Sequence, residues 1–150
     1  MNRDYQPRFF GDILHNTDNN LSNLLSVRFK VFNITPEQWN LLNSLILKDG
    51  INQKELAQTA GKTQTIVTRM LDILERKGFV ERRADPRDRR AYLVFITEKG
   101  RSLQQTLVSV GDKTMKMILK NILPERLELF YQICEDINRS TTEVMQNLKK

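Results

Sequence analysis

The sequence predicts a mainly helical chain with one small β-hairpin, and its central third carries the prediction. Two short capped helix patterns, 52–57 and 63–74, are separated by Gly61, a residue suited to the left-handed backbone of a tight turn. Residues 79–96 then have the pattern of two strands joined by a basic turn. A helix pair followed by a basic hairpin is the arrangement of a winged helix-turn-helix, in which a helix enters a DNA groove.

The N-terminal segment is expected to form an amphipathic helix. Apolar residues recur at spacings of three and four between Phe9 and Phe32, which is the period of one helix face. The polar stretch 15–20 interrupts this predicted helix, and Asn33-Ile34 ends it. Residues 1–8 carry no pattern.

The next helix has a well-marked start. Thr35 is placed to cap it, Pro36 occupies its first turn, and Gln38 completes a capping box. Its apolar face includes Trp39, which we expect in the core, and Asp49-Gly50 ends it. The following short helix repeats this pattern.

That short helix begins at Asn52, whose side chain can accept hydrogen bonds from free backbone N–H groups. Glu55 occupies the position from which a side chain can reach back to the cap. Leu56 and Ala57 are expected to be buried.

The helix after Gly61 is the candidate for reading bases. Its cap is Thr63, it ends at Gly78, and its predicted core stripe is Ile66, Val67, Met70, Leu71 and Leu74. The opposite face offers groups that match base edges: Arg suits guanine, Gln suits adenine, and Thr suits a base edge, a thymine methyl or a phosphate. The predicted DNA-binding residues of this helix are Thr63, Gln64, Thr65, Thr68 and Arg69.

The hairpin supplies a second set of candidates. Val80, Leu93 and Phe95 have strand character, and residues 85–88 have turn chemistry. Arginine is attracted to the negative potential of a narrow minor groove. Asp88 lies two residues from Arg90 and is placed to orient its guanidinium. The predicted DNA-binding residues of this wing are Arg87, Asp88, Arg89 and Arg90.

Charge is concentrated in the same region. Residues 76–90 hold seven basic and three acidic side chains, which is four of the six net positive charges of the chain. A focused basic patch favours a polyanionic partner, because binding releases counterions from phosphates. A solvated basic surface without a partner is the alternative.

Two long helices are expected after the hairpin. Thr97 is placed to cap the first, Leu123-Pro124 marks the turn, and the last helix runs towards the C-terminus. Cys134 lies on the apolar stripe of the last helix, where we expect a buried structural thiol rather than a redox sensor.

Composition excludes several function classes. No segment reaches the roughly 18 apolar residues of a membrane span, and the N-terminus lacks a signal pattern, so a cytoplasmic location is expected. One cysteine agrees with a reducing compartment. The single histidine, His15, excludes a metal site built on several imidazoles, and no cofactor motif is present. An enzyme is therefore not expected.

Segments 35–39, 54–57, 67–82, 85–90 and 96–100 together resemble the MarR (multiple antibiotic resistance regulator) family. These motifs cover about residues 35–100, in the order and spacing of the family. By motif position, Asp88 and Arg90 correspond to the Asp/Arg pair in the wing of the family. Gln64, Thr65, Thr68 and Arg69 fall on the recognition helix of the family. Lys62-Thr63-Gln64 departs from the family pattern near the helix start, where many members have an acidic or small residue. This departure leaves the operator sequence open but does not affect the expected fold.

The resemblance implies an architecture and a function. It implies a homodimer with a winged helix-turn-helix at 35–100 and helical dimerisation regions at 1–34 and 101–150. We expect a regulator, specifically a repressor, that binds double-stranded DNA at a near-palindromic operator and is released by a small phenolic-type ligand. His15 and Arg28 are candidates to line a ligand cleft. The alternative is an architectural DNA-binding protein of low sequence preference, with no effector.

Overall fold

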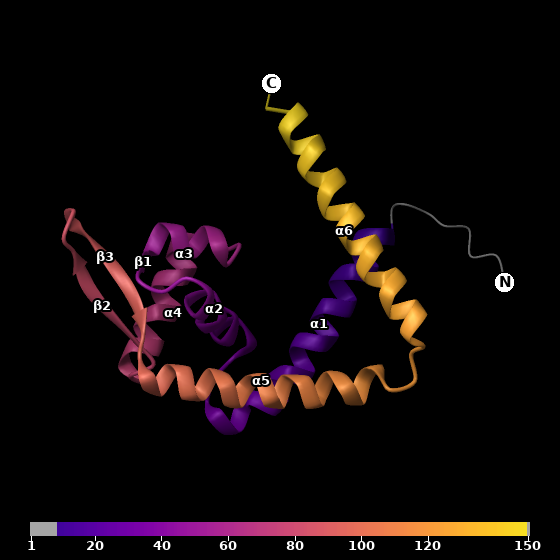
Figure 1. The fold of residues 1–150 in the computed structure, drawn as a ribbon, viewed down its shortest axis with the longest axis horizontal. Helices are drawn as coiled ribbons and strands as arrows, with labels where there is room; N and C mark the ends of the chain where they lie inside the picture. The colour runs from indigo at the N-terminus through magenta and orange to yellow at the C-terminus, as the bar shows by residue number, and fades with distance from the viewer. Residues whose placement is uncertain (1–8, 150) are drawn as a thin grey trace. The chain divides into compact units, whose positions relative to one another are not determined.

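The computed structural model describes residues 9–149, with side chains except those of Arg89 and Arg90. The described chain is mostly helical and has one small antiparallel sheet, as predicted (Figure 1). The elements, in chain order, are α1 (Phe10–Phe29), η2 (Lys30–Phe32), α2 (Pro36–Leu47), β1 (Ile51–Asn52), α3 (Gln53–Thr59), α4 (Gln64–Arg76), β2 (Val80–Asp85), β3 (Asp88–Ile96), α5 (Glu98–Leu119) and α6 (Pro124–Asn147).

The chain divides into two compact units, the first ending at Lys113 and the second starting at Thr114. Within the described residues the first unit holds α1 to β3 and most of α5, and the second holds the end of α5 and all of α6. The predicted helix-turn-helix and hairpin therefore lie in a single unit, where their geometry can be compared directly.

The predicted interruption of the N-terminal helix is wrong, because α1 continues through residues 15–20 without a break. These polar residues are exposed, so the helix buries no polar group there. Thr17 Oγ1 donates to the carbonyl of Ile13 at 2.7 Å, and His15 and Asn19 are hydrogen-bonded one turn apart. The predicted end is confirmed by Asn33, which has a left-handed backbone with φ of 54°.

Both helix starts predicted before Gly61 are confirmed, with one change. Thr35 and Gln38 form a complete capping box, with Gln38 N donating to Thr35 Oγ1 at 3.2 Å. Asn52 Oδ1 accepts from Glu55 N at 2.8 Å. Glu55, however, does not reach back to the cap, because its carboxylate is paired with Lys48.

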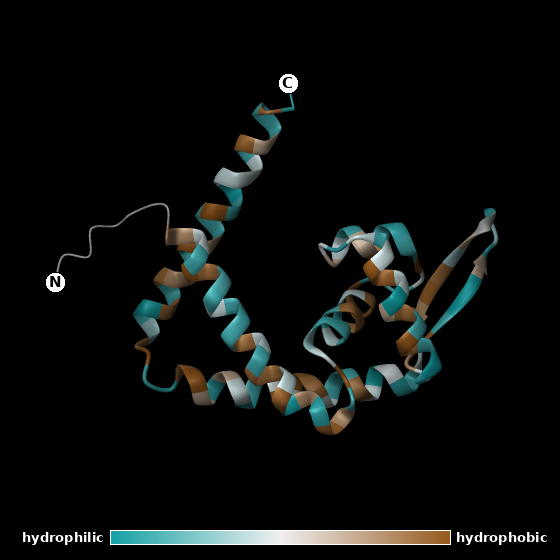
Figure 2. Cartoon of the chain, turned by 180° about the vertical axis from the view of Figure 1, so that it is seen from behind, coloured by the Kyte–Doolittle hydropathy of each residue, from teal (hydrophilic) through white to brown (hydrophobic). Residues whose placement is uncertain are grey.

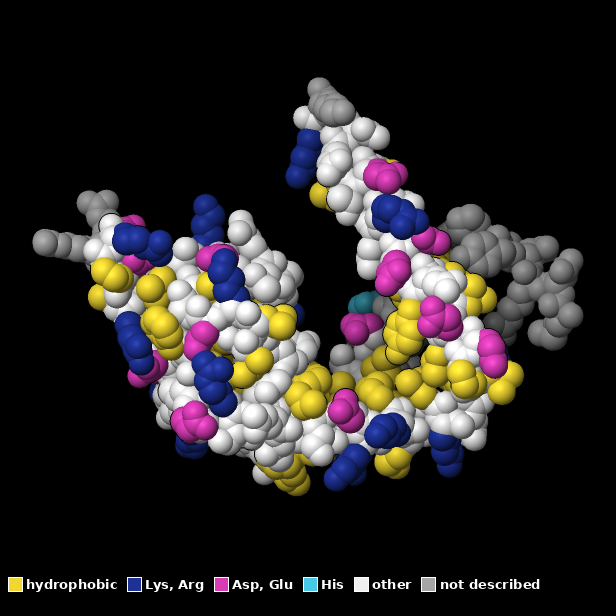
Figure 3. All heavy atoms as spheres, viewed as in Figure 1, with side chains coloured by type: hydrophobic (Ala, Val, Ile, Leu, Met, Phe, Trp, Pro, Cys, Tyr) yellow, Lys and Arg dark blue, Asp and Glu magenta, His cyan; other side chains and the backbone are white. Residues whose placement is uncertain are grey.

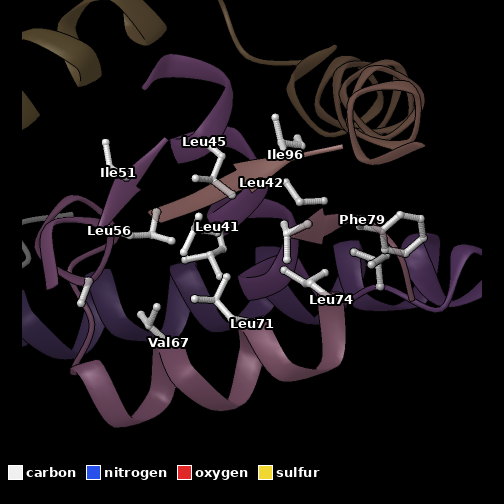
Figure 4. Packing of buried hydrophobic residues seen from close by; sticks show 14 of the residues in the cluster. Leu41, Leu42, Leu45, Ile51, Leu56, Val67, Leu71, Leu74, Phe79 and Ile96 are labelled. Atoms are coloured by element: carbon white, nitrogen blue, oxygen red, sulfur yellow. The ribbon is translucent and has the colours of Figure 1, made fainter. Parts of the chain in front are cut away.

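The core of the first unit lies where α4 packs against α2 and α3. Val67, Leu71 and Leu74 of α4 are fully buried and point towards leucines of α2 and α3 (Figure 4). Those leucines are Leu41, Leu42, Leu45 and Leu56. Trp39 packs against this core and meets the Phe29 ring edge-on, with centroids 5.2 Å apart. Burying one face of α4 in this way leaves its opposite face to solvent.

The sheet has three strands in the order β1-β3-β2, whereas the sequence predicted only β2 and β3. Strand β1 is two residues long and pairs Ile51 with Val94 and Asn52 with Leu93. The positive φ of 67° at Gly50 turns the chain into β1, and Gly50 N donates to Val94 O at 3.0 Å. This additional strand attaches the base of the hairpin to the start of α3.

The two long helices follow the prediction. Gly100 N donates to Thr97 Oγ1 at 3.0 Å, as expected for a cap at Thr97, and Pro124 begins α6. No described residue of α6 is buried, and brown apolar residues alternate with teal polar ones along it (Figure 2). Cys134 is half-buried, not buried as expected, because its helix buries no side chain within this chain.

Candidate nucleic-acid interface

Helix α4 is positioned by its cap and its buried stripe. Thr63 Oγ1 accepts from Ile66 N at 3.4 Å, which confirms the predicted cap. One residue of the predicted stripe is misplaced: Ile66 is 46% exposed, whereas Val67 is fully buried. A step of about 100° per residue separates the two, so Ile66 lies beside the core stripe rather than in it.

The polar residues of α4 that are predicted to read bases, Gln64, Thr65, Thr68 and Arg69, form what we call the reading face, and most of it is turned to solvent. Gln64, Thr65 and Arg69 are exposed, and within residues 9–149 the side chains of these three have no hydrogen-bond or ion-pair partner. The amide of Gln64 and the guanidinium of Arg69 therefore keep their full hydrogen-bonding capacity for another molecule.

Thr68 differs from its neighbours on this face. It is half-buried, and its hydroxyl donates to the carbonyl oxygen of Gln64 at 2.8 Å. The same Oγ1 accepts a hydrogen bond from Nε2 of Gln53, the first residue of α3. The two helices are thus joined by a side-chain contact on the predicted reading face.

The hairpin turn is organised by Asp85 and Arg87. Asp85 Oδ1 accepts from Arg87 N at 2.9 Å and from Arg87 Nε at 3.2 Å, and Oδ2 accepts from Nη2 at 3.3 Å. The side-chain bond from Arg87, reinforced by the backbone bond, holds the pKa of the Asp85 carboxyl below its ordinary value of 3.8. The same pairing raises the pKa of Arg87.

Of the other predicted wing residues, the structure describes the side chain of Asp88 but only the backbone of Arg89 and Arg90. Asp88 is exposed and pairs with Asp85 in the strand register, where residues 85–88 make the predicted turn. Arg89 and Arg90 belong to β3 by backbone, but their side chains lie outside the described residues. The hairpin tip has a hydrophilic sequence, drawn in teal (Figure 2). The predicted Asp88–Arg90 contact therefore remains a prediction.

Arg82 is a structural residue of this interface that was not among the predicted site residues. Its side chain is 18% exposed, and its guanidinium donates to Glu75 Oε2 at 2.6 Å and to Asp72 Oδ1 at 2.7 Å. The backbone N–H of Arg82 also donates to Glu75 Oε1 at 3.0 Å. Strand β2 is thereby joined to α4.

Two sequence signals could have identified this contact. Residues two apart on a strand share a face, so Arg82 lies on the same face as the buried Val80. Asp72 and Glu75 are three apart on α4 and therefore neighbours on its surface. A cation on the inner face of a strand needs such a pair of carboxylates.

Several basic side chains of the cluster at 76–90 are already paired with groups of the protein itself. Arg83 pairs with Glu81 and lies 4.4 Å from the centroid of the Phe95 ring. Lys77 Nζ donates to the carbonyl of Asn33, and Arg76 Nε donates to that of Asp72. In the view of Figure 3, magenta acidic side chains lie among the blue basic ones around this unit.

A groove of about 370 Å³ adjoins the start of α4. It lies among the first residues of α3 and α4 and the hairpin strand β3. Its lining residues are Asn52, Gln53, Lys54, Gln64, Ala91 and Tyr92. The groove thus brings together the elements that the sequence predicted would act on one partner.

A second cavity, of about 350 Å³, lies at the α1–α2 connection and the end of α4. Its lining residues are Ser26, Lys30, Asn33, Ile34, Thr35, Gln38, Ile73 and Lys77. The predicted ligand-cleft residues His15 and Arg28 are exposed on α1 and line neither cavity.

Among residues 9–149 no group of three or more His, Cys, Asp or Glu side chains is arranged to hold a metal ion. None of the described helices is long and apolar enough to cross a membrane.

Comparison with known proteins gives consistent matches. The MarR family model matches residues 34–92. The transcriptional regulator HosA of Escherichia coli O111:H- is 30% identical over 100 residues, which is 67% of this chain and 74% of HosA.

Solved structures extend the likeness beyond the matched segment. A mutant MarR from Escherichia coli, complexed with operator DNA, has a TM-score of 0.79 at 26% identity, with 85% of this chain and 91% of that chain covered. A MarR transcriptional regulator from Methanosarcina mazei Go1 has a TM-score of 0.82 at 22% identity, with 91% and 99% covered. The repressor CouR, bound to a DNA duplex, has a TM-score of 0.80 at 23% identity, with 92% and 98% covered. The last two likenesses concern the fold alone.

Proposed function

The chain belongs to the MarR family, and from that premise we propose that it is a transcription regulator that binds a specific DNA operator through α4 and the β2–β3 hairpin. Two relatives support the proposal: HosA is a transcriptional regulator, and the Escherichia coli MarR mutant is complexed with operator DNA. The fold and the local geometry of this chain supply the rest of the argument.

One observation carries the proposal: α4 presents unpaired polar side chains on the face opposite its buried stripe. Thr65 and Arg69 are exposed on that face, and Gln64 is exposed beside the stripe at the helix start, while Val67 and Leu71 are buried and anchor the helix. A polar face of this kind near a helix start matches the donors and acceptors of base edges in the major groove.

The hairpin is proposed to contact an adjacent groove. Its orientation relative to α4 is constrained by Arg82, which bonds to Asp72 and Glu75. Arg87 is 81% exposed in spite of its pairing with Asp85, so its guanidinium is accessible to phosphate oxygens. Arg89 and Arg90 are kept as proposed contacts on the sequence alone.

We propose that the protein acts as a homodimer through the regions 1–34 and 101–150. Helix α6 and its C-cap residue expose large apolar side chains that their own chain does not bury: Leu129, Phe130, Ile133, Val144 and Leu148. An uncovered apolar stripe of this length favours association with a second copy. A dimer would explain recognition of a near-palindromic operator, because each half-site meets one protomer.

Repression and release by a small phenolic-type ligand complete the proposal, supported by the family resemblance. Titration of the operator complex with a series of phenolic acids tests the release. Loss of the complex at ligand concentrations that leave the protein folded is the expected result.

The experiment that tests the proposed function is selection of genomic fragments on the purified protein at two salt concentrations, followed by sequencing. We expect enrichment of a near-palindromic sequence with half-sites about one helical turn apart. Binding without enrichment that falls steeply with salt would instead indicate an architectural protein held by phosphate contacts. Absence of binding at both concentrations would contradict both functions.

A further inference from the structure

Thr68 is the residue of the proposed reading face for which the structure restricts the kind of contact that the side chain can make with DNA. A threonine can offer DNA a hydroxyl or a methyl group, and the two read different features of a base pair. The single hydroxyl proton of Thr68 is committed to the carbonyl oxygen of Gln64 at 2.8 Å. Threonine in a helix adopts the rotamer that allows this bond to the residue four earlier.

Gln53 adds a second restraint from another helix. Its Nε2 donates to Thr68 Oγ1, so that one lone pair of the hydroxyl is also occupied. Gln53 is the first residue of α3 and is half-buried, and both Gln53 and Gln64 line the groove at the start of α4. Rotating the Thr68 hydroxyl towards a partner would break two hydrogen bonds, whereas the methyl group, held in place on the same Cβ, can make an apolar contact without breaking either.

We propose that Gln53 is a positioning residue that fixes the Thr68 hydroxyl within the protein, so that Thr68 reads a thymine through its C5-methyl group. Thymine is the one base that presents a methyl group in the major groove, beside its O4 acceptor. Contact between two methyl groups is apolar and needs no hydrogen bond from Thr68. This inference rests on the proposed function, because it assumes that α4 enters the major groove of a specific operator.

A hydroxyl-based alternative makes a different prediction. The remaining lone pair of Thr68 Oγ1 could accept from an amino group of adenine or cytosine. In that case the hydroxyl would be essential and the methyl dispensable. Valine keeps the methyl group and replaces the hydroxyl by a second methyl, whereas serine keeps the hydroxyl and removes the methyl, so the two substitutions separate the alternatives.

The experiment uses the full-length protein and the operator obtained by genomic selection. Each thymine in turn is replaced by uracil in both half-sites, which removes the C5-methyl and keeps O4. At one thymine we expect wild-type affinity to fall about fourfold per half-site, the equivalent of about 0.8 kcal/mol for one methyl-sized apolar group. Thr68→Val should keep this preference, and Thr68→Ser should bind thymine and uracil equally at that position.

Gln53 is tested through the same readout. Gln53→Ala should reduce the preference for thymine over uracil at that position and leave the preferences at other positions unchanged. In the Thr68→Val background it should have no further effect, because there is no hydroxyl to hold. A merely structural role for Gln53 would weaken binding to all operators alike, in either background.

Thr65→Ser is the matched control, since it removes a methyl from an exposed neighbour on α4 and should leave the preference at the Thr68-dependent thymine intact. Unfolding midpoints in urea show that each variant is folded. The inference is overturned if no thymine has a sensitivity that depends on residue 68, or if Thr68→Val loses the preference as Thr68→Ser does. Specific operator binding with no effect of uracil overturns this inference alone, whereas no specific binding by wild type overturns the proposed function with it.

Discussion

Arg82 and Glu75 are joined by two hydrogen bonds, one from the Arg82 guanidinium at 2.6 Å and one from its backbone N–H at 3.0 Å. The first belongs to the side chain and the second to the strand itself, so the contact fixes both the position and the direction of β2 at this point. Because Glu75 belongs to α4, the hairpin and the helix are held as one piece. A protein that contacts two grooves at once needs such a rigid connection.

Arg82→Ala should lower the free energy of unfolding by about 1–3 kcal/mol, because it leaves two carboxylates without their shared cation. Urea denaturation measures this change. Arg83→Ala is the matched control on the next residue: Arg83 is 62% exposed and its pair with Glu81 is on the surface, so the loss should not exceed about 1 kcal/mol. Equal losses for the two variants would show that the Arg82 contacts contribute no special stability.

Arg69→Ala should weaken operator binding by about 1–3 kcal/mol and relax sequence preference at one base pair, if the guanidinium reads a guanine. Because Arg69 has no partner among the described side chains, the unfolding free energy should stay within about 0.5 kcal/mol of wild type. Binding to a set of single-base operator variants measures both effects. Arg126→Ala, an equal change of charge on α6, serves as control. Uniform weakening on all operators would identify Arg69 as a phosphate contact.

Gly100→Ala should destabilise the first unit. A Cβ at Gly100 would lie 2.1 Å from the backbone carbonyl oxygen of Phe79, which a helix start cannot accommodate without moving the hairpin base. Overpacking of this kind costs about 1–3 kcal/mol, measurable by urea denaturation. Gly11→Ala in α1 is the control, because a Cβ there would have no heavy atom within 4 Å. That substitution should be neutral or stabilise by up to about 1 kcal/mol.

The hairpin turn should contribute to stability in a pH-dependent way. Hydrogen bonds from Arg87 depress the pKa of Asp85 in the folded state below 3.8. The ionised carboxylate therefore stabilises the fold at pH values above 3.8, and this contribution is lost as the pH falls through the lower, folded-state value. The difference in unfolding free energy between wild type and Asp85→Asn should be constant near neutral pH and shrink in acid. A difference that grows towards acid pH would contradict the assignment.

The local features of the fold were predictable from the sequence. The caps at Thr35, Asn52, Thr63 and Thr97 involve residues within three positions of each other, so a short stretch of sequence contains both partners. The turn at 85–88 is local for the same reason. The continuity of α1 was missed because residues 15–20 are exposed on all sides of the helix. Such a helical stretch has no apolar periodicity, so in the sequence it looks the same as a break.

Long-range features were not predictable in this way. Strand β1 exists because Ile51 and Asn52 pair with Val94 and Leu93, and two residues alone carry no strand pattern. The exposure of Ile66 depends on which side of α4 faces α2. The spacing of apolar residues alone does not decide whether Ile66 or its neighbour Val67 faces the core. Glu55 had a local role available and takes a different partner, Lys48, the residue that follows α2.

The sequence by itself determined the order of the long helices and the hairpin, the helix starts and the polar residues of α4 that remain exposed, because helix period and capping act over a few residues. Only the tertiary structure decided which of the charged and polar side chains are already engaged. Arg82 is committed to α4 and the Thr68 hydroxyl to Gln53 and Gln64, whereas Arg69 is free among the described residues. The physical reason is that a hydrogen-bond donor is available to DNA only if no nearer acceptor in the folded chain has taken it, and the nearest acceptors to Arg82 come from a different element.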